Sequence, residues 1–324
     1  MIKYLLSGIV FFILNPAIAS EAWTPKGPIK IIVPFSPGGT TDIIARAISE
    51  KLSEEIKQPV VIENRAGAGG TIGTALVAKA DPDGSTIGLS TVTTNASNHV
   101  FFKDLPYHPL SDFEYVITIA ATPKVFVSKA DFPTSSFTET IKTLQQAPNK
   151  FAYGSVPGGI DYLYGETFKK LTNTDITFVP YKGGAQAMTD LMGGHIQFMF
   201  DNLPLVLPNV QTGKVKLLAI SWPQRLKEFP DVPTWAELGY PQLNLDTWYG
   251  LSLPKNTPKN IVDYYNAAMK KVLADPKVQE QLRSNIAYLV GDTPDQARQR
   301  VESTIIKLEK VANDMKIDKK DQAK

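Results

Sequence analysis

The sequence predicts an α/β fold of two lobes, each with a mainly parallel sheet flanked by helices. Strand-like apolar runs alternate with helix-like stretches along the chain, which is typical of sheets covered by helices. The length of 324 residues exceeds the ~100–200 residues of one domain, so two lobes are expected. Four strand-like runs also pass through a Gly-containing turn into a helix-like stretch, a connection common in α/β sheets.

The strand candidates are short runs rich in Val, Ile and Phe, with turn residues between them. They cover 29–34, 60–63, 86–90, 115–120, 125–128, 151–154, 177–179, 197–200 and 215–220. From the placement of these runs we expect lobe one over 20–122 and 247–324 and lobe two over 123–246. The chain would cross between the lobes near 120–124 and 246–251.

Helix candidates lie between these strands, and three are well marked. The first follows Gly39, with Thr40 or Thr41 as its N-cap, and repeats apolar residues at near 3.6-residue spacing: Ile43, Ile44, Ala47, Ile48, Leu52 and Ile56. The second follows Pro258, with an apolar face of Ile261, Tyr265, Met269, Val272 and Leu273. The third opens on a capping box from Thr293 to Gln296, with Pro294 at its first position.

The first residues resemble a cleavable signal peptide. Lys3 precedes an apolar run over 4–14, and Ala17-Ile18-Ala19 offers small residues for cleavage after Ala19. This run is short of the ~20 residues that cross a membrane, and no later run approaches that length. We therefore expect residues 1–19 to be removed and the mature chain to reside in the periplasm without membrane insertion. The sequence has no Cys, so its stability must come from core burial.

Composition and motifs argue against several function classes. The formal charge is +2 with basic and acidic residues mixed throughout, unlike the clustered basic surface of a nucleic-acid-binding protein. The Gly-rich turns lack the Lys of a phosphate-binding P-loop, and the 67–73 stretch has Ile72 where a dinucleotide fingerprint needs a small residue. No His, Cys or Ser pattern indicates a metal site or a catalytic nucleophile. We expect no cofactor, no metal and no enzyme activity. A carboxylate-handling transferase or a degenerate dinucleotide-dependent enzyme is the alternative.

The Gly-containing turns predict an anion site. They cover 36–39, 66–70, 154–159 and 181–184, each directly before a helix candidate. Free N–H groups and the helix dipole favour a carboxylate or phosphate at a helix N-terminus. If two lobes each contribute such turns to one cleft, they surround a small ligand with backbone donors.

Five sequence blocks resemble the extracytoplasmic substrate-binding proteins of tripartite tricarboxylate transporters. They are VPFSPGGTTD at 33–42, VIENRAGAGG at 61–70, VPYKGG at 179–184, DLMGG at 190–194 and DVPT at 231–234. The resemblance covers nearly the whole mature chain in order. It implies a two-lobed, Venus-flytrap-like protein that captures a small mono- or dicarboxylate and delivers it to a two-component membrane permease.

The resemblance also implies which residues bind the ligand, through backbone amides, hydroxyls and bridging waters. Arg65 could serve as a counter-ion, although the adjoining Glu63 and Asn64 favour a role in fixing its loop. The implied set in lobe one is Phe35, Ser36, Pro37, Gly38, Gly39, Thr40, Asp42, Thr91, Thr93 and Thr94. In lobe two it is Gly154, Ser155, Gly158, Gly159, Asp161, Lys182, Gly183 and Asp201, with Gly184 beside them.

Asp161 departs from the family pattern, which has a hydroxyl residue after the second-lobe Gly-x-Gly and a His shortly before Gly-Glu. An acidic side chain would repel the distal carboxylate of a dicarboxylate in a closed cleft. Either Asp161 points outward as a helix-capping residue, or the ligand carries an amino or other donor group at that end.

Overall fold

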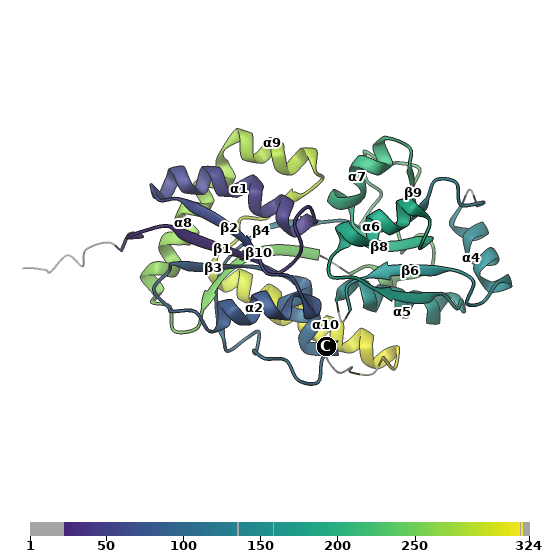
Figure 1. Ribbon diagram of the computed structural model, residues 1–324, viewed down its shortest axis with the longest axis horizontal. Helices are drawn as coiled ribbons and strands as arrows, with labels where there is room; N and C mark the ends of the chain where they lie inside the picture. Colours follow the sequence, from purple (N-terminus) through teal and green to yellow (C-terminus); the bar gives the residue numbers. More distant parts are fainter. Residues whose placement is uncertain (1–22, 135, 158, 246, 318, 320–324) are drawn as a thin grey trace, which may run out of the picture.

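The computed structural model describes residues 23–134, 136–157, 159–245, 247–317 and 319, and these form two lobes side by side (Figure 1). The signal peptide predicted at 1–19 lies outside the described residues. Each lobe is one sheet with helices on both faces, so the predicted two-lobed α/β fold is confirmed.

Lobe one is built on a six-stranded sheet in the order β11-β4-β10-β3-β1-β2. Its strands are β1 (Ile29–Val33), β2 (Val60–Asn64), β3 (Thr86–Thr91), β4 (Phe113–Thr122), β10 (Thr247–Pro254) and β11 (Tyr288–Leu289). Strand β1 pairs in parallel with β2 and β3, whereas β10 runs antiparallel between β3 and β4.

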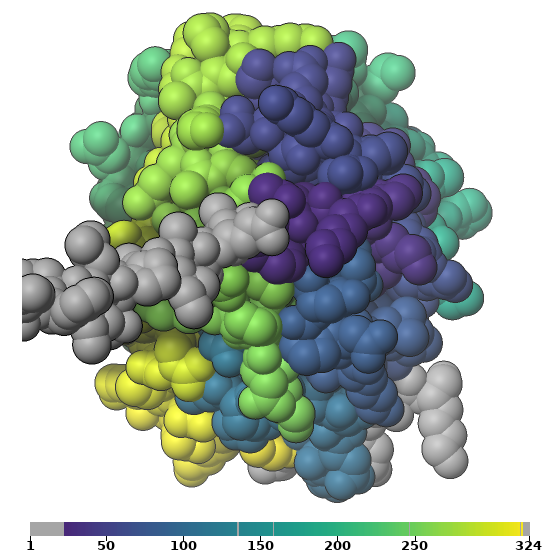
Figure 2. Space-filling view, turned by 90° about the vertical axis from the view of Figure 1, so that its left-hand side faces the viewer, coloured from purple at the N-terminus to yellow at the C-terminus, as the bar shows by residue number. Residues whose placement is uncertain are grey.

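Helices cover both faces of this sheet because side chains of β1 alternate between them. Ile31 and Val33 pack with α1 (Thr40–Ile56), α8 (Lys259–Ala274) and α9 (Pro276–Ser284), and Ile32 packs with Val77 of α2 (Thr71–Ala78) and with α10 (Pro294–Asp314). Figure 2 shows the early residues of the chain directly beside the light-green residues of the α8 and α9 region. Ion pairs join α1 to this region, with Glu50 Oε2 3.1 Å from Lys277 Nζ.

Lobe two is built on a five-stranded sheet in the order β7-β6-β8-β5-β9. Its strands are β5 (Lys124–Lys129), β6 (Ala152–Ser155), β7 (Thr177–Pro180), β8 (Phe198–Asn202) and β9 (Val215–Ser221). Helices α4 (Phe137–Gln146) and α5 (Ile160–Thr172) pack on one face, and α6 (Gly184–Gly193) and α7 (Leu203–Gln211) on the other. In its core the rings of Phe126 and Phe200 stack with their centres 4.7 Å apart.

Short helical segments complete the chain. They are η1 (Ala68–Gly70), η2 (Thr93–Ser97), α3 (Asn98–Phe101) and η3 (Pro241–Leu243). Within the described residues no helix combines the length and the apolar character needed to cross a membrane.

Three details differ from the sequence-based predictions. Each sheet is mixed rather than mainly parallel, because β10 enters lobe one and β5 enters lobe two running against their neighbours. Segment 247–251 was expected to be only a crossover, yet it begins the fully buried strand β10. The predicted N-cap is also wrong: Gly39 is the N-cap of α1, and Thr40 is its first helical residue. By contrast, the capping box at Thr293 is confirmed.

The lobes are joined where strands of the two sheets follow one another. Strand β4 ends at Thr122, and β5 starts at Lys124. The Thr122 and Thr247 hydroxyls lie 3.2 Å apart, which ties this segment to the start of β10. A further link lies just beyond the end of α10, where Lys170 Nζ of α5 donates to the Lys316 carbonyl at 2.8 Å.

Candidate functional site

A cavity of about 50 Å³ lies between the two lobes. This volume holds only a few water-sized spheres, so it suits a small molecule. Residues of both lobes line it: Phe35, Ser36, Gly39, Thr40, Thr41, Thr91, Thr93 and Tyr249 from lobe one, and Val156, Asp161, Gly183, Gly184, Asp201, Asn202 and Leu205 from lobe two.

Four helices begin at or beside this cavity. The N-caps of α1, α5 and α6 are Gly39, Gly159 and Gly183, and α7 begins after Asn202. None of the four N-cap side chains accepts a hydrogen bond from its own helix, so first-turn N–H groups of α1, α5 and α6 stay available to a ligand. In α7 the first N–H, that of Leu203, donates instead to the Pro123 carbonyl at 2.9 Å. Convergent positive helix ends favour a bound carboxylate.

Thr40 adds an unused donor at the same place. Its side chain is 5% exposed and lines the cavity, and its hydroxyl has no hydrogen-bond partner among the described residues. Burying a hydroxyl without a partner is unfavourable. The α1 N-terminus and this hydroxyl together form a site that a ligand oxygen would complete.

Asp42 supports the first turn from behind. Its Oδ2 accepts from Gly38 N at 3.0 Å and from Arg46 Nε at 2.8 Å, and its Oδ1 accepts from Asn64 Nδ2 at 3.0 Å. Burial alone would raise the pKa of Asp42, but the hydrogen bonds from Arg46, Gly38 and Asn64 outweigh it and lower the pKa. Asp42 therefore fixes the loop before α1, in which Pro37 and Gly38 are exposed. Pro37, Gly38 and Asp42 do not line the cavity.

The hydroxyls expected near Thr91 are divided between the cavity and the core. Thr91 and Thr93 line the cavity, whereas Thr94 Oγ1 donates to Asn95 Oδ1 at 2.7 Å within the protein. Tyr249 lies opposite Thr91 in the antiparallel pair of β10 and β3 and completes this wall. Sequence reasoning missed Tyr249 because β10 was not expected to be a strand.

The two lobes touch around the cavity through glycines. A Cβ on Gly183 would lie 3.5 Å from Ser36 Oγ, and one on Gly159 would lie 3.3 Å from Thr93 Cγ2. The 66–70 turn packs behind this contact, because a Cβ on Gly69 would meet the Pro157 carbonyl oxygen at 2.7 Å. Three of the four Gly-containing turns thus bring helix starts to the cavity, and the fourth supports them.

Three further predicted residues of lobe two lie away from the cavity lining. Gly154 leaves room for packing, since a Cβ there would meet Ile196 Cδ1 at 2.6 Å. The Ser155 hydroxyl donates to the Val156 carbonyl at 3.3 Å, and Lys182 is exposed. Gly158 lies outside the described residues.

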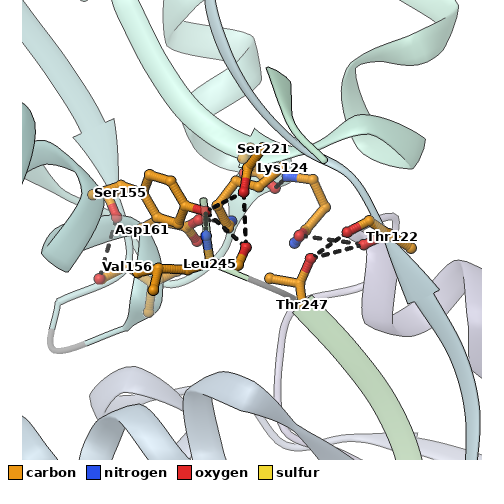
Figure 3. Close-up of polar contacts among 11 residues, drawn as sticks. Thr122, Lys124, Ser155, Val156, Asp161, Ser221, Leu245 and Thr247 are labelled. Atoms are coloured by element: carbon orange, nitrogen blue, oxygen red, sulfur yellow. Dashed lines mark hydrogen bonds and ion pairs between the residues drawn. The ribbon is translucent and has the colours of Figure 1, made fainter. Parts of the chain in front are cut away.

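Asp161 does not point outward as a capping residue. It is 8% exposed, lines the cavity and forms an ion pair with Lys124 (Figure 3). Lys124 is itself 1% exposed, and its Nζ lies 5.7 Å from the centre of the Tyr164 ring. Sequence reasoning missed Lys124 because it treated 120–124 as a crossover, although a Lys directly before a buried strand was a usable signal.

Asp201 is the second buried carboxylate of lobe two, 8% exposed. Its Oδ1 accepts from Asn202 N at 2.7 Å. Burial raises the pKa of Asp201, although the positive charge of Lys124 opposes this shift. Burial also lowers the pKa of Lys124 to about 8, although the negative charge of Asp201 opposes that shift. Burial and the charge of Asp201 together also raise the pKa of Tyr249.

Arg65 lies outside the cavity lining. Its side chain is 54% exposed and pairs with Glu63, which agrees with a role in fixing its loop. Among the described residues, no group of three or more His, Asp or Glu side chains is placed to hold a metal ion.

Comparison with known proteins identifies the family. The family model of the tripartite tricarboxylate transporter family receptor matches residues 44–316. The chain belongs to this family. The receptor is 36% identical over 299 residues to Protein BugT of Bordetella pertussis, covering 91% of this chain and 92% of that protein. The family resemblance of the five sequence blocks is thereby confirmed.

Solved structures share the whole architecture of this receptor. A periplasmic transporter is 42% identical with a TM-score of 0.88, covering 91% of this chain and 99% of that chain. An R. palustris protein solved with adipate is 34% identical with a TM-score of 0.87 and the same coverage. MatC from Rhodopseudomonas palustris, solved with malate, is 30% identical with a TM-score of 0.85, covering 89% and 99%.

Proposed function

We propose that this receptor captures a small carboxylate-bearing molecule in the cavity between its lobes and delivers it to a two-component membrane permease. It catalyses no reaction in this role. The observation that carries the proposal is the convergence of helix N-termini on a cavity that also holds the unpartnered Thr40 hydroxyl. The adipate and malate in two structural relatives support the same ligand class.

We assign the ligand contacts to both lobes. Ser36, Gly39, Thr40, Thr91 and Thr93 offer backbone or hydroxyl donors from lobe one, and Gly183 and Gly184 offer the start of α6 from lobe two. A carboxylate held by these groups needs no arginine counter-ion, because the helix ends and hydroxyls supply the donors. Asp42 acts on the site only through the loop that it fixes.

We further propose that the lobes move as units over 20–122 with 247–324 and over 123–246, after removal of residues 1–19 on export. The segment from Thr122 to Lys124 and the start of β10 would serve as hinges, because the chain passes between the lobes there. Changes of backbone angle at these few residues are enough to change the angle between the lobes. Ser36 and Gly183, which approach each other across the cavity, would separate on opening and release the ligand.

A thermal-shift screen of the mature protein tests this function. A ligand that binds only the folded state at one hundred times its Kd adds about 2.7 kcal/mol of stability, which raises the Tm by several degrees. The screen should cover monocarboxylates, dicarboxylates, tricarboxylates, aromatic acids and amino acids, with neutral analogues as controls. At least one carboxylate should shift the Tm; no shift from any acid would overturn the proposal.

A further inference from the structure

We propose that the lobe-two wall of the cavity selects a carboxylate ligand that also carries a protonated amino group, so that the ligand is an amino acid or a related zwitterion. This inference rests on the proposed function and adds the second recognition element of the same site. Lobe one would hold the carboxylate of the ligand, and Asp161 and Asp201 would receive the ammonium group.

The two walls of the cavity differ in charge. The lining residues that the structure describes in lobe one are all neutral, with hydroxyl groups on Ser36, Thr40 and Thr93 among them. The lining residues of lobe two include two carboxylates, Asp161 and Asp201, each 8% exposed. A ligand with a negative and a positive end matches this division, whereas a dicarboxylate would place one negative end against two carboxylates.

A single cation, Lys124, lies near both of these carboxylates, and its charge also opposes the rise in the pKa of Asp201. It is paired with Asp161, and together with Asp201 the three buried groups carry one excess negative charge when all are ionised. Asp201 Oδ1 accepts from Asn202 N, while Asp201 Oδ2 has no donor among the described residues. The N-termini of α6 and α7 offset part of the negative charge of these carboxylates, but each carries only a partial positive charge.

Gly184 keeps Asp201 in place for this role. A Cβ on Gly184 would collide with Asp201 Oδ2 and would come within 2.5 Å of Leu205 Cδ2. The absence of a side chain therefore lets the carboxylate lie over the start of α6 at the cavity wall. The surroundings also disfavour an isolated charge there, because burial raises the pKa of Asp201 more than the charge of Lys124 and the hydrogen bond from Asn202 N lower it. An incoming ammonium would stabilise the ionised carboxylate.

Matched acid pairs test the inference by titration calorimetry. Glutarate and 5-aminopentanoate have the same number of carbons and differ only at one end, which is a carboxylate in the first and an ammonium in the second, and adipate and 6-aminohexanoate form a second such pair. We expect the wild type to bind at least one amino member roughly tenfold or more tightly than its plain diacid. Asp201→Asn should reduce that ratio by about tenfold, because the amide cannot pair with an ammonium as a carboxylate does.

Two further variants keep the test decisive. Asp161→Asn should also lower the ratio, and it frees Lys124 to pair with a second carboxylate, so plain diacids should gain affinity. Asp190→Asn is the matched control, since Asp190 accepts from the Tyr181 hydroxyl at 2.6 Å outside the cavity lining, and its ratio should equal that of the wild type. Circular dichroism and Tm measurements would verify that each variant is folded.

The outcomes separate the two proposals. Tighter binding of plain diacids than of their amino analogues by the wild type would overturn the inference and leave the carboxylate-binding function intact. An unchanged ratio in folded Asp161→Asn and Asp201→Asn would also overturn it. Equal affinity of the wild type for a plain diacid and its amino partner, with proton uptake on binding of the diacid in buffers of different ionisation enthalpy, would overturn it as well, because a proton would then replace the ammonium in neutralising the carboxylates. Failure of every acid to bind would overturn both proposals.

Discussion

Replacing Thr40 by Val should raise stability and weaken ligand binding at once. The substitution keeps the β-branched shape at the first residue of α1 and removes only the buried hydroxyl, which has no partner among the described residues. A buried hydroxyl without a hydrogen bond costs about 1–3 kcal/mol in protein mutational data, so the free energy of unfolding of the ligand-free variant should rise.

The effect on binding should have the opposite sign. A hydrogen bond to a charged group contributes about 1.5–3 kcal/mol, and a tenfold change in Kd corresponds to about 1.4 kcal/mol. If the Thr40 hydroxyl donates to the ligand carboxylate, Thr40→Val should weaken binding by roughly tenfold to a hundredfold. Urea unfolding without ligand and titration calorimetry with the tightest acid from the screen measure the two effects separately.

Thr167 provides the matched control. Its hydroxyl is also buried without a partner among the described residues, but it lies in α5 and does not line the cavity. Thr167→Val should therefore equal or exceed the wild type in stability and leave the Kd unchanged. The reasoning would be refuted if Thr40→Val destabilised the ligand-free protein and bound the ligand with wild-type affinity.

Three other substitutions test the first turn. Gly39→Val should weaken binding roughly tenfold or more, because the added side chain would block the close approach of a carboxylate to the start of α1. It should cost little stability, since Gly39 has an ordinary extended backbone (φ −78°) and a Cβ would meet only Ser36 O at 3.6 Å. Arg65→Ala should change the Kd far less; the reverse order by calorimetry would indicate a salt-bridge site. Asp42→Asn should cost about 1–3 kcal/mol of unfolding free energy near neutral pH through lost charge-assisted bonds. Because the pKa of Asp42 is lowered, its contribution is present above the ordinary aspartate pKa and disappears as pH falls through the folded value. Urea unfolding of both proteins at neutral and acidic pH should show the difference shrinking, and a difference that grew in acid would contradict this assignment.

The strands that carry long apolar runs were predictable from the sequence. All nine strand candidates are present. Runs such as 31–33 are buried on both faces of a sheet and need no alternation. Strand β10 was not predicted, since Gly250 and the closing Pro254 are uncommon within strands. Its burial depends on insertion between β3 and β4, which are distant in sequence.

The site was predictable where backbone geometry defines it. Gly39 and Gly183 stand directly before helices, and the local pattern placed them correctly. The charged part required tertiary information, because Lys124, Asp161 and Asp201 come from β5, α5 and β8 and meet only after lobe two folds. The spacing of these three residues along the sequence does not indicate that they lie together in the folded protein.

The decisive measurement is a crystal structure of the mature receptor with the tightest-binding acid from the screen. We predict a ligand carboxylate in the cavity, with its oxygens about 2.7–3.2 Å from the first N–H groups of α1 and from the Thr40 hydroxyl. A carboxylate bound to Arg65, or bound anywhere outside the cavity between the lobes, would contradict it.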